Sequence, residues 1–214
     1  MSDSEKVLVK ICGITRFEDG MCALSAGVDF IGLVFYHKSP RYILPQAAEA
    51  MMARFRDEGF PDVRAIGVFV NETPERINRI VQNLDLFAVQ LHADEPPEYA
   101  AKIQSCVIKA VRIRDESDLD VIGKWPAWAY LCDAWHPEHY GGTGKRIDAS
   151  MISPYVSRNR VILAGGLNPE NVSEALAVAD FFAVDVSSGV EESPGKKDHE
   201  KVRKFIRAVK KFKK

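Results

Sequence analysis

The strongest constraint on the fold of this 214-residue chain is its alternation of short apolar runs with amphipathic stretches. The runs are rich in aliphatic and β-branched residues, as strands buried on both faces of a parallel sheet are. Eight such runs are present, at residues 7–12, 30–35, 65–70, 88–92, 107–113, 129–134, 161–166 and 182–188. Their order predicts an α/β protein in which helices connect neighbouring parallel strands.

Four of the intervening stretches place apolar residues at the i, i+3, i+4, i+7 spacing of a helix face. They lie at residues 48–55, 77–84, 172–179 and 202–209. Typical helix starts are also present: Thr73 and Asn168 each precede a proline, and Thr15 is followed by Glu18 in the pattern of a capping box.

Eight strand–helix units in about this length predict a single-domain (β/α)8 TIM barrel that includes all of residues 1–214. The weaker stretches 115–123 and 149–156 are then short helices of the barrel. The competing architecture is an open doubly wound sheet. We favour the barrel because eight units form a natural closure and no G-x-G-x-x-G motif opens the chain.

Composition and charge exclude several kinds of partner. A net charge of −1 does not indicate nucleic-acid binding. The lysine-rich end 210–214 is interpreted as a solvated helix terminus. No apolar run approaches the roughly 20 residues of a membrane span, and the first residues lack the apolar core of a signal peptide. Four cysteines without a C-x-x-C pair favour a cytoplasmic protein over a disulfide framework or a zinc site.

In a barrel of this type the active site lies at the carboxyl ends of the strands. Cys12 ends the first run, and strand alternation places it on the same face as Lys10, pointing into the barrel. By position alone, a small core residue is the favoured explanation of Cys12. Asp133 lies at the end of the sixth run, where it pairs with a lysine, caps a turn or takes part in the chemistry. The glycine-rich loop 139–145 that follows favours the last of these roles.

Two further strand ends carry titratable side chains. Asp185 has the same inward parity as Ser187, and it either binds substrate or neutralises Lys10, the second being slightly preferred. His92 ends the fourth run, where a structural and a functional role are equally well supported.

The loops after the seventh and eighth runs, residues 164–171 and 187–191, are typical of a phosphate site. Glycines allow backbone N–H groups to converge on an anion, and the candidates here are Gly166, Ser188 and Gly189. No phosphate-loop lysine motif and no cluster of metal ligands is recognisable, so we expect neither a nucleoside triphosphate nor a catalytic metal.

Taken in order, these motifs resemble those of phosphoribosylanthranilate isomerases. The matching stretches run from Lys10 to Asp198: KICGIT, SPR at 39–41, GVFVN at 67–71, VQLH, the aspartate followed by GGTGK, LAGGLNPENV, AVDVSSGVE and PGKKD. The resemblance implies a cofactor-free (β/α)8 barrel of tryptophan biosynthesis whose partner is a small phosphorylated substrate. Such an enzyme converts N-(5-phosphoribosyl)anthranilate to 1-(2-carboxyphenylamino)-1-deoxyribulose 5-phosphate by general acid–base catalysis, an Amadori rearrangement.

The resemblance also implies roles for three residues: Cys12 as the base, Asp133 as the acid and Arg41 as the contact for the anthranilate moiety. Lys10 is expected to favour the thiolate of Cys12, and an apolar loop around Trp135 to raise the pKa of Asp133. The alternative for Arg41 is a surface arginine paired with an acidic neighbour.

The chain departs from the family pattern in two places. Ala93 stands where a glycine is expected, and the segment 134–140 is unusual in carrying a tryptophan and two histidines. Two other functions are considered. One is a different phosphosugar enzyme, either an isomerase with a pair of acid–base aspartates or a lyase with a Schiff-base lysine, for which Lys109 sits too early in its strand. The other is a non-catalytic binding barrel. The sequence does not decide between a monomer and a homodimer.

Overall fold

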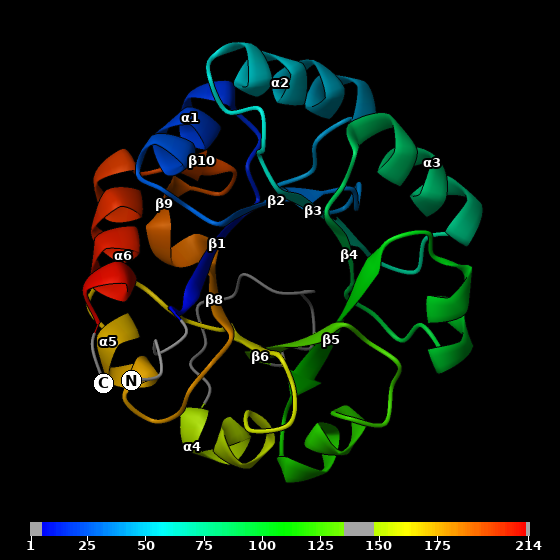
Figure 1. Cartoon of the computed structure of the whole chain (residues 1–214), viewed down its shortest axis with the longest axis vertical. Helices are drawn as coiled ribbons and strands as arrows, with labels where there is room; N and C mark the ends of the chain where they lie inside the picture. The colour runs from blue at the N-terminus through cyan, green and yellow to red at the C-terminus, as the bar shows by residue number, and fades with distance from the viewer. Residues whose placement is uncertain (1–5, 135–147, 213–214) are drawn as a thin grey trace.

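The computed structural model describes residues 6–134 and 148–212, and in it eight parallel strands close into a barrel (Figure 1). Each strand pairs with its neighbours in chain order, and β8 pairs with β1 to complete the ring. The strands are β1 (Leu8–Cys12), β2 (Phe30–Val34), β3 (Ala65–Phe69), β4 (Ala88–Leu91), β5 (Cys106–Ile113), β6 (Ala129–Ala134), β7 (Val161–Leu163) and β8 (Ala183–Val186). The predicted (β/α)8 barrel is therefore confirmed.

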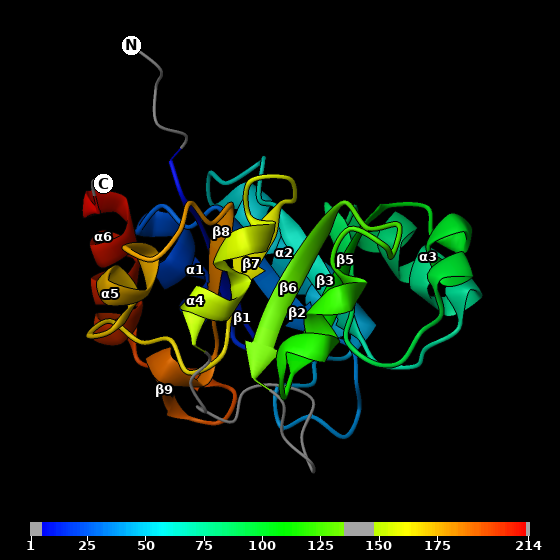
Figure 2. The same cartoon turned by 90° about the horizontal axis from the view of Figure 1, so that it is seen from below.

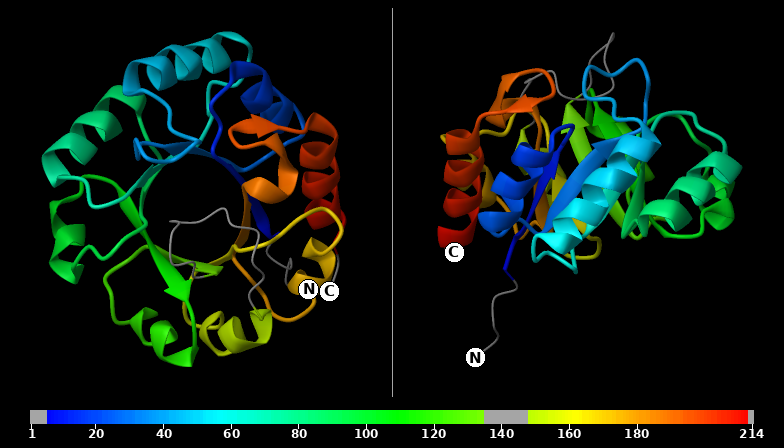
Figure 3. Two further views of the ribbon diagram at one scale, coloured as in Figure 1. Left: turned by 180° about the vertical axis from the view of Figure 1, so that it is seen from behind. Right: turned by 90° about the horizontal axis from the view of Figure 1, so that it is seen from above.

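Helices surround the barrel as an outer layer (Figures 1 and 3). Those after β1, β2, β3 and β8 are regular, whereas the others are short or 3-10 in type. In chain order the helical elements are α1 (Phe17–Ser25), α2 (Pro45–Asp57), α3 (Pro74–Leu84), η1 (Pro97–Lys102), η2 (Glu116–Val121), α4 (Ala149–Ile152), η3 (Ser153–Tyr155), α5 (Val172–Leu176), η4 (Ser188–Val190) and α6 (His199–Lys211). A small hairpin of β9 (Glu191–Ser193) and β10 (Lys196–Lys197) precedes α6.

The predicted helix starts are only partly correct. Thr73 accepts a hydrogen bond from the backbone N–H of Arg76, and Pro74 opens α3 as expected. The predicted capping box at Thr15 is wrong, because α1 begins at Phe17 and the Thr15 hydroxyl donates instead to the carbonyl of Gly195. The start predicted at Asn168 is also wrong: this residue caps a turn that precedes α5.

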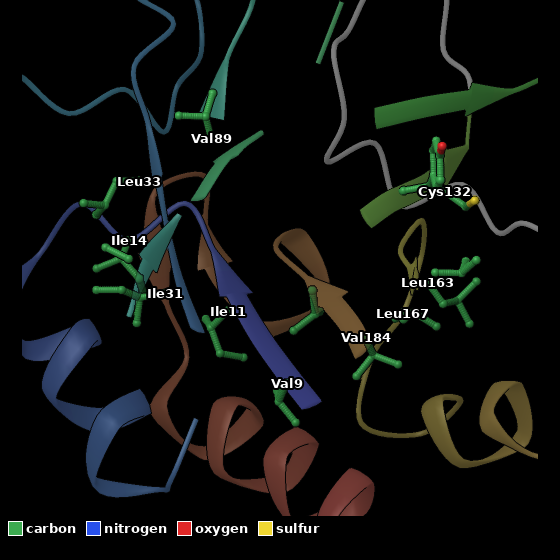
Figure 4. Packing of buried hydrophobic residues seen from close by; sticks show 14 of the residues in the cluster. Val9, Ile11, Ile14, Ile31, Leu33, Val89, Cys132, Leu163, Leu167 and Val184 are labelled. Carbon is green, nitrogen blue, oxygen red and sulfur yellow. The ribbon is translucent and has the colours of Figure 1, made fainter. Parts of the chain in front are cut away.

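Two apolar layers give the barrel its core. One fills the space between strands and helices, and Figure 4 shows Val9, Ile11 and Ile31 pointing outward into it. The other fills the barrel interior with residues such as Phe30 and Ile162. Because Ile11 belongs to the outer layer, its neighbours Lys10 and Cys12 face the interior, as strand alternation predicts.

The carboxyl ends of the strands and the β9–β10 hairpin lie at the same end of the barrel (Figure 2). This end carries the candidate residues and is called the mouth below. None of the described helices has the length and apolar character needed to cross a membrane.

Candidate active site

Cys12 lies at the last position of β1, where its side chain is almost completely buried. Space for the thiol comes from Gly32 on β2, since a Cβ there would be only 2.8 Å from Sγ. Gly13 has a φ of +78°, which a side chain rarely tolerates, and a Cβ there would be 2.6 Å from Cδ of Arg41. A glycine after the thiol is therefore required both by the turn and by the arginine that crosses it.

Lys10 is fully buried one layer below Cys12 and forms an ion pair with Asp185. Its Nζ is 3.1 Å from Oδ1 of Asp185 and 3.0 Å from Oε1 of Gln90. Burial works to lower the pKa of Lys10, but Asp185 and then Cys12 raise it, and the net pKa lies above its ordinary value. The structure thus brings Lys10 and Asp185 together in the counter-ion arrangement, and Lys10 stays charged.

Burial dominates the ionisation of Cys12. It raises the pKa of the thiol, Lys10 and Lys197 lower it, and Asp185 raises it again, with a net result above the ordinary value. Lys10 lowers the pKa of Cys12, as expected, but this effect is smaller than that of burial. The thiolate loses more solvation energy in this position than it gains from the nearby ammonium group.

Asp133 is the penultimate residue of β6 and is buried at the mouth. Burial, and then the charge of Asp185, raise the pKa of Asp133 to about 7, although the backbone N–H of Ala134 donates to Oδ1 at 2.8 Å. A large fraction of this carboxyl group is therefore protonated at neutral pH. The cause expected from the sequence, the loop around Trp135, lies outside the described residues.

Arg41 is held at the mouth by Glu191. Its Nε and Nη2 donate to the two carboxylate oxygens at 2.8 and 2.7 Å, a bidentate ion pair in which Arg41 is 12% and Glu191 5% exposed at the side chain. Glu191 also accepts from Nζ of Lys197 at 2.8 Å. The pairing that was the alternative for Arg41 is present, but it fixes the arginine within the mouth rather than on the open surface.

The two predicted phosphate loops lie against each other. Gly165 and Gly166 have φ of +82° and +66°, and a Cβ on Gly189 would be 1.9 Å from the carbonyl oxygen of Leu167. The hydrogen bonds of the described residues leave the backbone N–H groups of Gly166, Ser188 and Gly189 unused. These loops adjoin Cys12, because the Ser187 hydroxyl donates to the Cys12 carbonyl at 3.1 Å.

Sequence reasoning missed three residues of the site: Gln90, Glu191 and Lys197. Gln90 shares the inward parity of His92, so strand alternation could have identified it. No local signal indicates that Glu191 meets Arg41 across 150 positions of sequence. The predicted glycine-rich loop 139–145 lies outside the described residues.

A closed parallel barrel whose mouth holds a thiol, a carboxyl group with a pKa near neutrality and two glycine-rich loops defines a (β/α)8-barrel protein equipped for acid–base chemistry. The family model for N-(5'-phosphoribosyl)anthranilate (PRA) isomerase matches residues 9–208. This chain belongs to that family.

Individual relatives agree with the family match. N-(5'-phosphoribosyl)anthranilate isomerases of Trichlorobacter lovleyi and Thermotoga maritima are each 48% identical to the chain, and each alignment covers 95% of this chain and 98% of the relative. The crystal structure of the Thermotoga maritima enzyme superposes with a TM-score of 0.87 at 46% identity, again over 95% and 98% of the two chains. A further isomerase structure, in complex with reduced 1-(o-carboxyphenylamino)-1-deoxyribulose 5-phosphate, superposes with a TM-score of 0.84 at 44% identity over the same shares.

Proposed function

We infer that this chain is a phosphoribosylanthranilate isomerase, which converts N-(5-phosphoribosyl)anthranilate to 1-(2-carboxyphenylamino)-1-deoxyribulose 5-phosphate in tryptophan biosynthesis. The observation that carries the inference is that the Cys12 thiol and the Asp133 carboxyl group both lie at the carboxyl ends of barrel strands, in a chain of this family. The direct test is to add phosphoribosylanthranilate and to follow the loss of its fluorescence. Binding without turnover would indicate a non-catalytic barrel instead.

The reaction needs an acid and a base that act on different atoms of one sugar. The protonated Asp133 gives its proton to the ring oxygen as the ribofuranose opens, leaving an iminium ion and a carboxylate. Cys12 removes the proton from C2′ in its thiolate form, which is the minor form because burial raises the pKa of the thiol. The product is an enolamine that tautomerises to the ketone. No atoms are gained or lost, as an isomerisation requires. Both groups are restored when Cys12 releases the proton it took and Asp133 takes up one proton to replace the one it gave.

A Schiff-base reaction finds no support at Lys109. This side chain leaves β5 on its outer face, and Nζ is 2.9 Å from Oε2 of the buried Glu95 and also donates to the carbonyl of Ala93. An ammonium group held by these two acceptors has no path into the barrel interior.

We propose that the substrate phosphate is bound by the backbone N–H groups of Gly166, Ser188 and Gly189, with Asp185 lining the same side of the mouth. The unused N–H groups and the contact between the two loops support this proposal. We expect Ser188→Ala to leave the inhibition constant of inorganic phosphate nearly unchanged, since the hydroxyl is not needed. Gly189→Ala must separate the loops from each other and should weaken phosphate inhibition about tenfold.

The two substitutions form a matched pair, because both add or remove few atoms within the same loop. Inhibition by anthranilate serves as the control and should change little in either variant. An equal loss of phosphate and anthranilate inhibition in Gly189→Ala would mean a collapsed mouth and would contradict the phosphate assignment.

We propose that Arg41 contacts the anthranilate carboxylate, with Glu191 fixing its orientation. Support comes from its place beside Cys12 and from the rigid bidentate pair, whose contacts with the described residues use Nε and Nη2. Arg41→Lys keeps the charge but loses the planar fork, so kcat/KM should fall roughly ten- to hundredfold, and Arg41→Met should fall further. An aniline analogue without the carboxylate provides the control: if Arg41→Met loses as much activity on it as on the true substrate, the arginine does not contact the carboxylate.

We propose that residues 1–214 form one domain, which the family match over residues 9–208 supports. We propose a cytoplasmic location, for which the four free cysteines are the support. One solved structure from Thermotoga maritima contains monomers generated from the dimeric isomerase of that organism. We propose that this chain is either a monomer or a homodimer, without a nucleic-acid or membrane partner.

A further inference from the structure

A chain of polar side chains crosses the barrel interior beneath the mouth. It runs from Asp185 to Lys10 at 3.1 Å, from Lys10 to Oε1 of Gln90 at 3.0 Å, and from Nε2 of Gln90 to Nδ1 of His92 at 2.7 Å. The last side chain in this row, His92, faces Asp133, and its Nε2 is 3.8 Å from Oδ2 of Asp133. The row of polar side chains therefore links the side of the barrel that carries the thiol to the side that carries the acid.

The charge of Lys10 fixes the direction of every hydrogen bond in this chain. An ammonium group can only donate, so the amide atom of Gln90 that faces it must be the oxygen. The NH2 group of Gln90 then faces His92, and Nδ1 of His92 must accept. A neutral imidazole whose Nδ1 accepts carries its proton on Nε2, the nitrogen that points toward Asp133.

His92 is uncharged in this position. It is 5% exposed, and burial, followed by the charges of Lys10, Arg112 and Lys109, lowers the pKa of His92 to about 3. Its Nε2 is buried and has no hydrogen-bond partner among the described residues. The distance of 3.8 Å from Nε2 of His92 to Oδ2 of Asp133 is too long for a hydrogen bond. The N–H donor of His92 therefore lies next to the acid but does not bond to it.

We propose that His92 is a positioning residue of the acid–base reaction, held by Lys10 and Gln90 as the neutral Nε2–H tautomer so that it donates to Oδ2 of Asp133 once that carboxyl group has released its proton. The proposal rests on the isomerase function inferred above. In the molecules that begin turnover with Asp133 protonated, the carboxylate appears on proton transfer, and the hydrogen bond from His92 then forms to the charged group. A donor that engages at that point stabilises the developing charge.

The other two states of His92 would work against the acid. An imidazolium ion would hold Asp133 as a carboxylate before turnover begins, because an adjacent opposite charge favours ionisation. The opposite tautomer would present a bare nitrogen with no donor for the carboxylate. The remaining charges facing Asp133 are Asp185, which favours the protonated form, and Lys10 and Arg112, which oppose it.

The test compares two replacements of His92 in the full-length protein. His92→Gln retains an N–H donor near the position of Nε2, whereas His92→Phe keeps the ring volume and removes the donor. We expect His92→Phe to lower kcat about tenfold with KM changed less than twofold, and to move the pKa of Asp133 in the pH profile of kcat/KM upward. His92→Gln should recover most of kcat and the original profile.

A merely structural histidine would give the reverse order, because glutamine fills the ring cavity less well than phenylalanine. Equal impairment of the two variants, or an unshifted pH profile in His92→Phe, would overturn the proposal. The tautomer is tested separately by ¹⁵N NMR of the substrate-free protein, in which His92 should show a protonated Nε2 and a bare Nδ1. Gln90→Leu should abolish this preference. A protonated Nδ1 in the wild type would overturn the proposal even if the isomerase activity is present, and a missing activity with the expected tautomer would instead count against the proposed function.

Discussion

Replacing Cys12 by alanine or Asp133 by asparagine is expected to lower kcat for phosphoribosylanthranilate by about 100-fold or more. This is the usual scale for the loss of a general base or a general acid. Cys12→Ala leaves no group to accept the C2′ proton, and Asp133→Asn keeps the shape of the acid while removing its transferable proton. Fluorescence of the substrate measures both effects, and thermal unfolding should show that each variant is still folded.

Matched substitutions of the same chemistry separate function from packing. Cys132→Ala removes a second buried thiol, on the outer face of β6, whose pKa burial raises to about 12 and which has no role in the mechanism. Asp62→Asn neutralises an exposed carboxylate far from the mouth. Both controls should retain most of the activity. Near-normal turnover by Cys12→Ala or by Asp133→Asn would remove that residue from the proposed mechanism.

The second large effect concerns stability and pH. A carboxyl group that burial holds at a pKa of about 7 binds its proton more tightly in the folded protein than in the unfolded chain, where the value is about 3.8. The associated stability is fully present below the unfolded value and is lost as pH rises through the folded one. Asparagine does not titrate, so Asp133→Asn should gain roughly 3–4 kcal/mol in unfolding free energy relative to wild type between pH 4 and pH 8.

Urea unfolding of both proteins at the two pH values provides the measurement. The comparison uses the difference between the proteins, so that titrations elsewhere and any pH-independent cost of the amide cancel. If the difference in unfolding free energy is the same at pH 4 and pH 8, the carboxyl group does not have a raised pKa. Asp133 would then be ionised at neutral pH and unsuited to act as the acid.

Strand positions were predictable because they depend on local composition. All eight barrel strands fall on the apolar runs of the sequence, since strands covered on both faces are mostly apolar. Helix starts were less predictable. Thr15 has the side chain and spacing of a cap, yet its hydroxyl bonds to Gly195, which lies near it only in the folded chain. A tertiary contact of this kind overrides the local preference.

The same division applies to the site. Lys10, Cys12 and Asp133 follow from strand alternation and strand ends. The raised pKa of Cys12 could not be predicted from the sequence, because the cost of burying a thiolate depends on neighbours that only the fold supplies. Glu191 was not recognisable either, since an acidic residue in a loop is usually solvated and only the structure shows that two buried cations meet it.

The contacts that build the mouth join the two ends of the chain, and this has a consequence for the order in which the protein can be made. The Lys10–Asp185 pair and the hydrogen bond from Ser187 to Cys12 each span 175 positions, and the Arg41–Glu191 pair spans 150. During synthesis, β1 therefore exists for most of the elongation time with an ammonium group that has no counter-ion. Only when β8 and the β9–β10 hairpin have emerged can the barrel close over that charge, and closure completes the catalytic mouth in the same step. A chain that stops short of β8 lacks both a sealed barrel and a catalytic mouth, so catalytic competence requires that β8 and the β9–β10 hairpin have been synthesised.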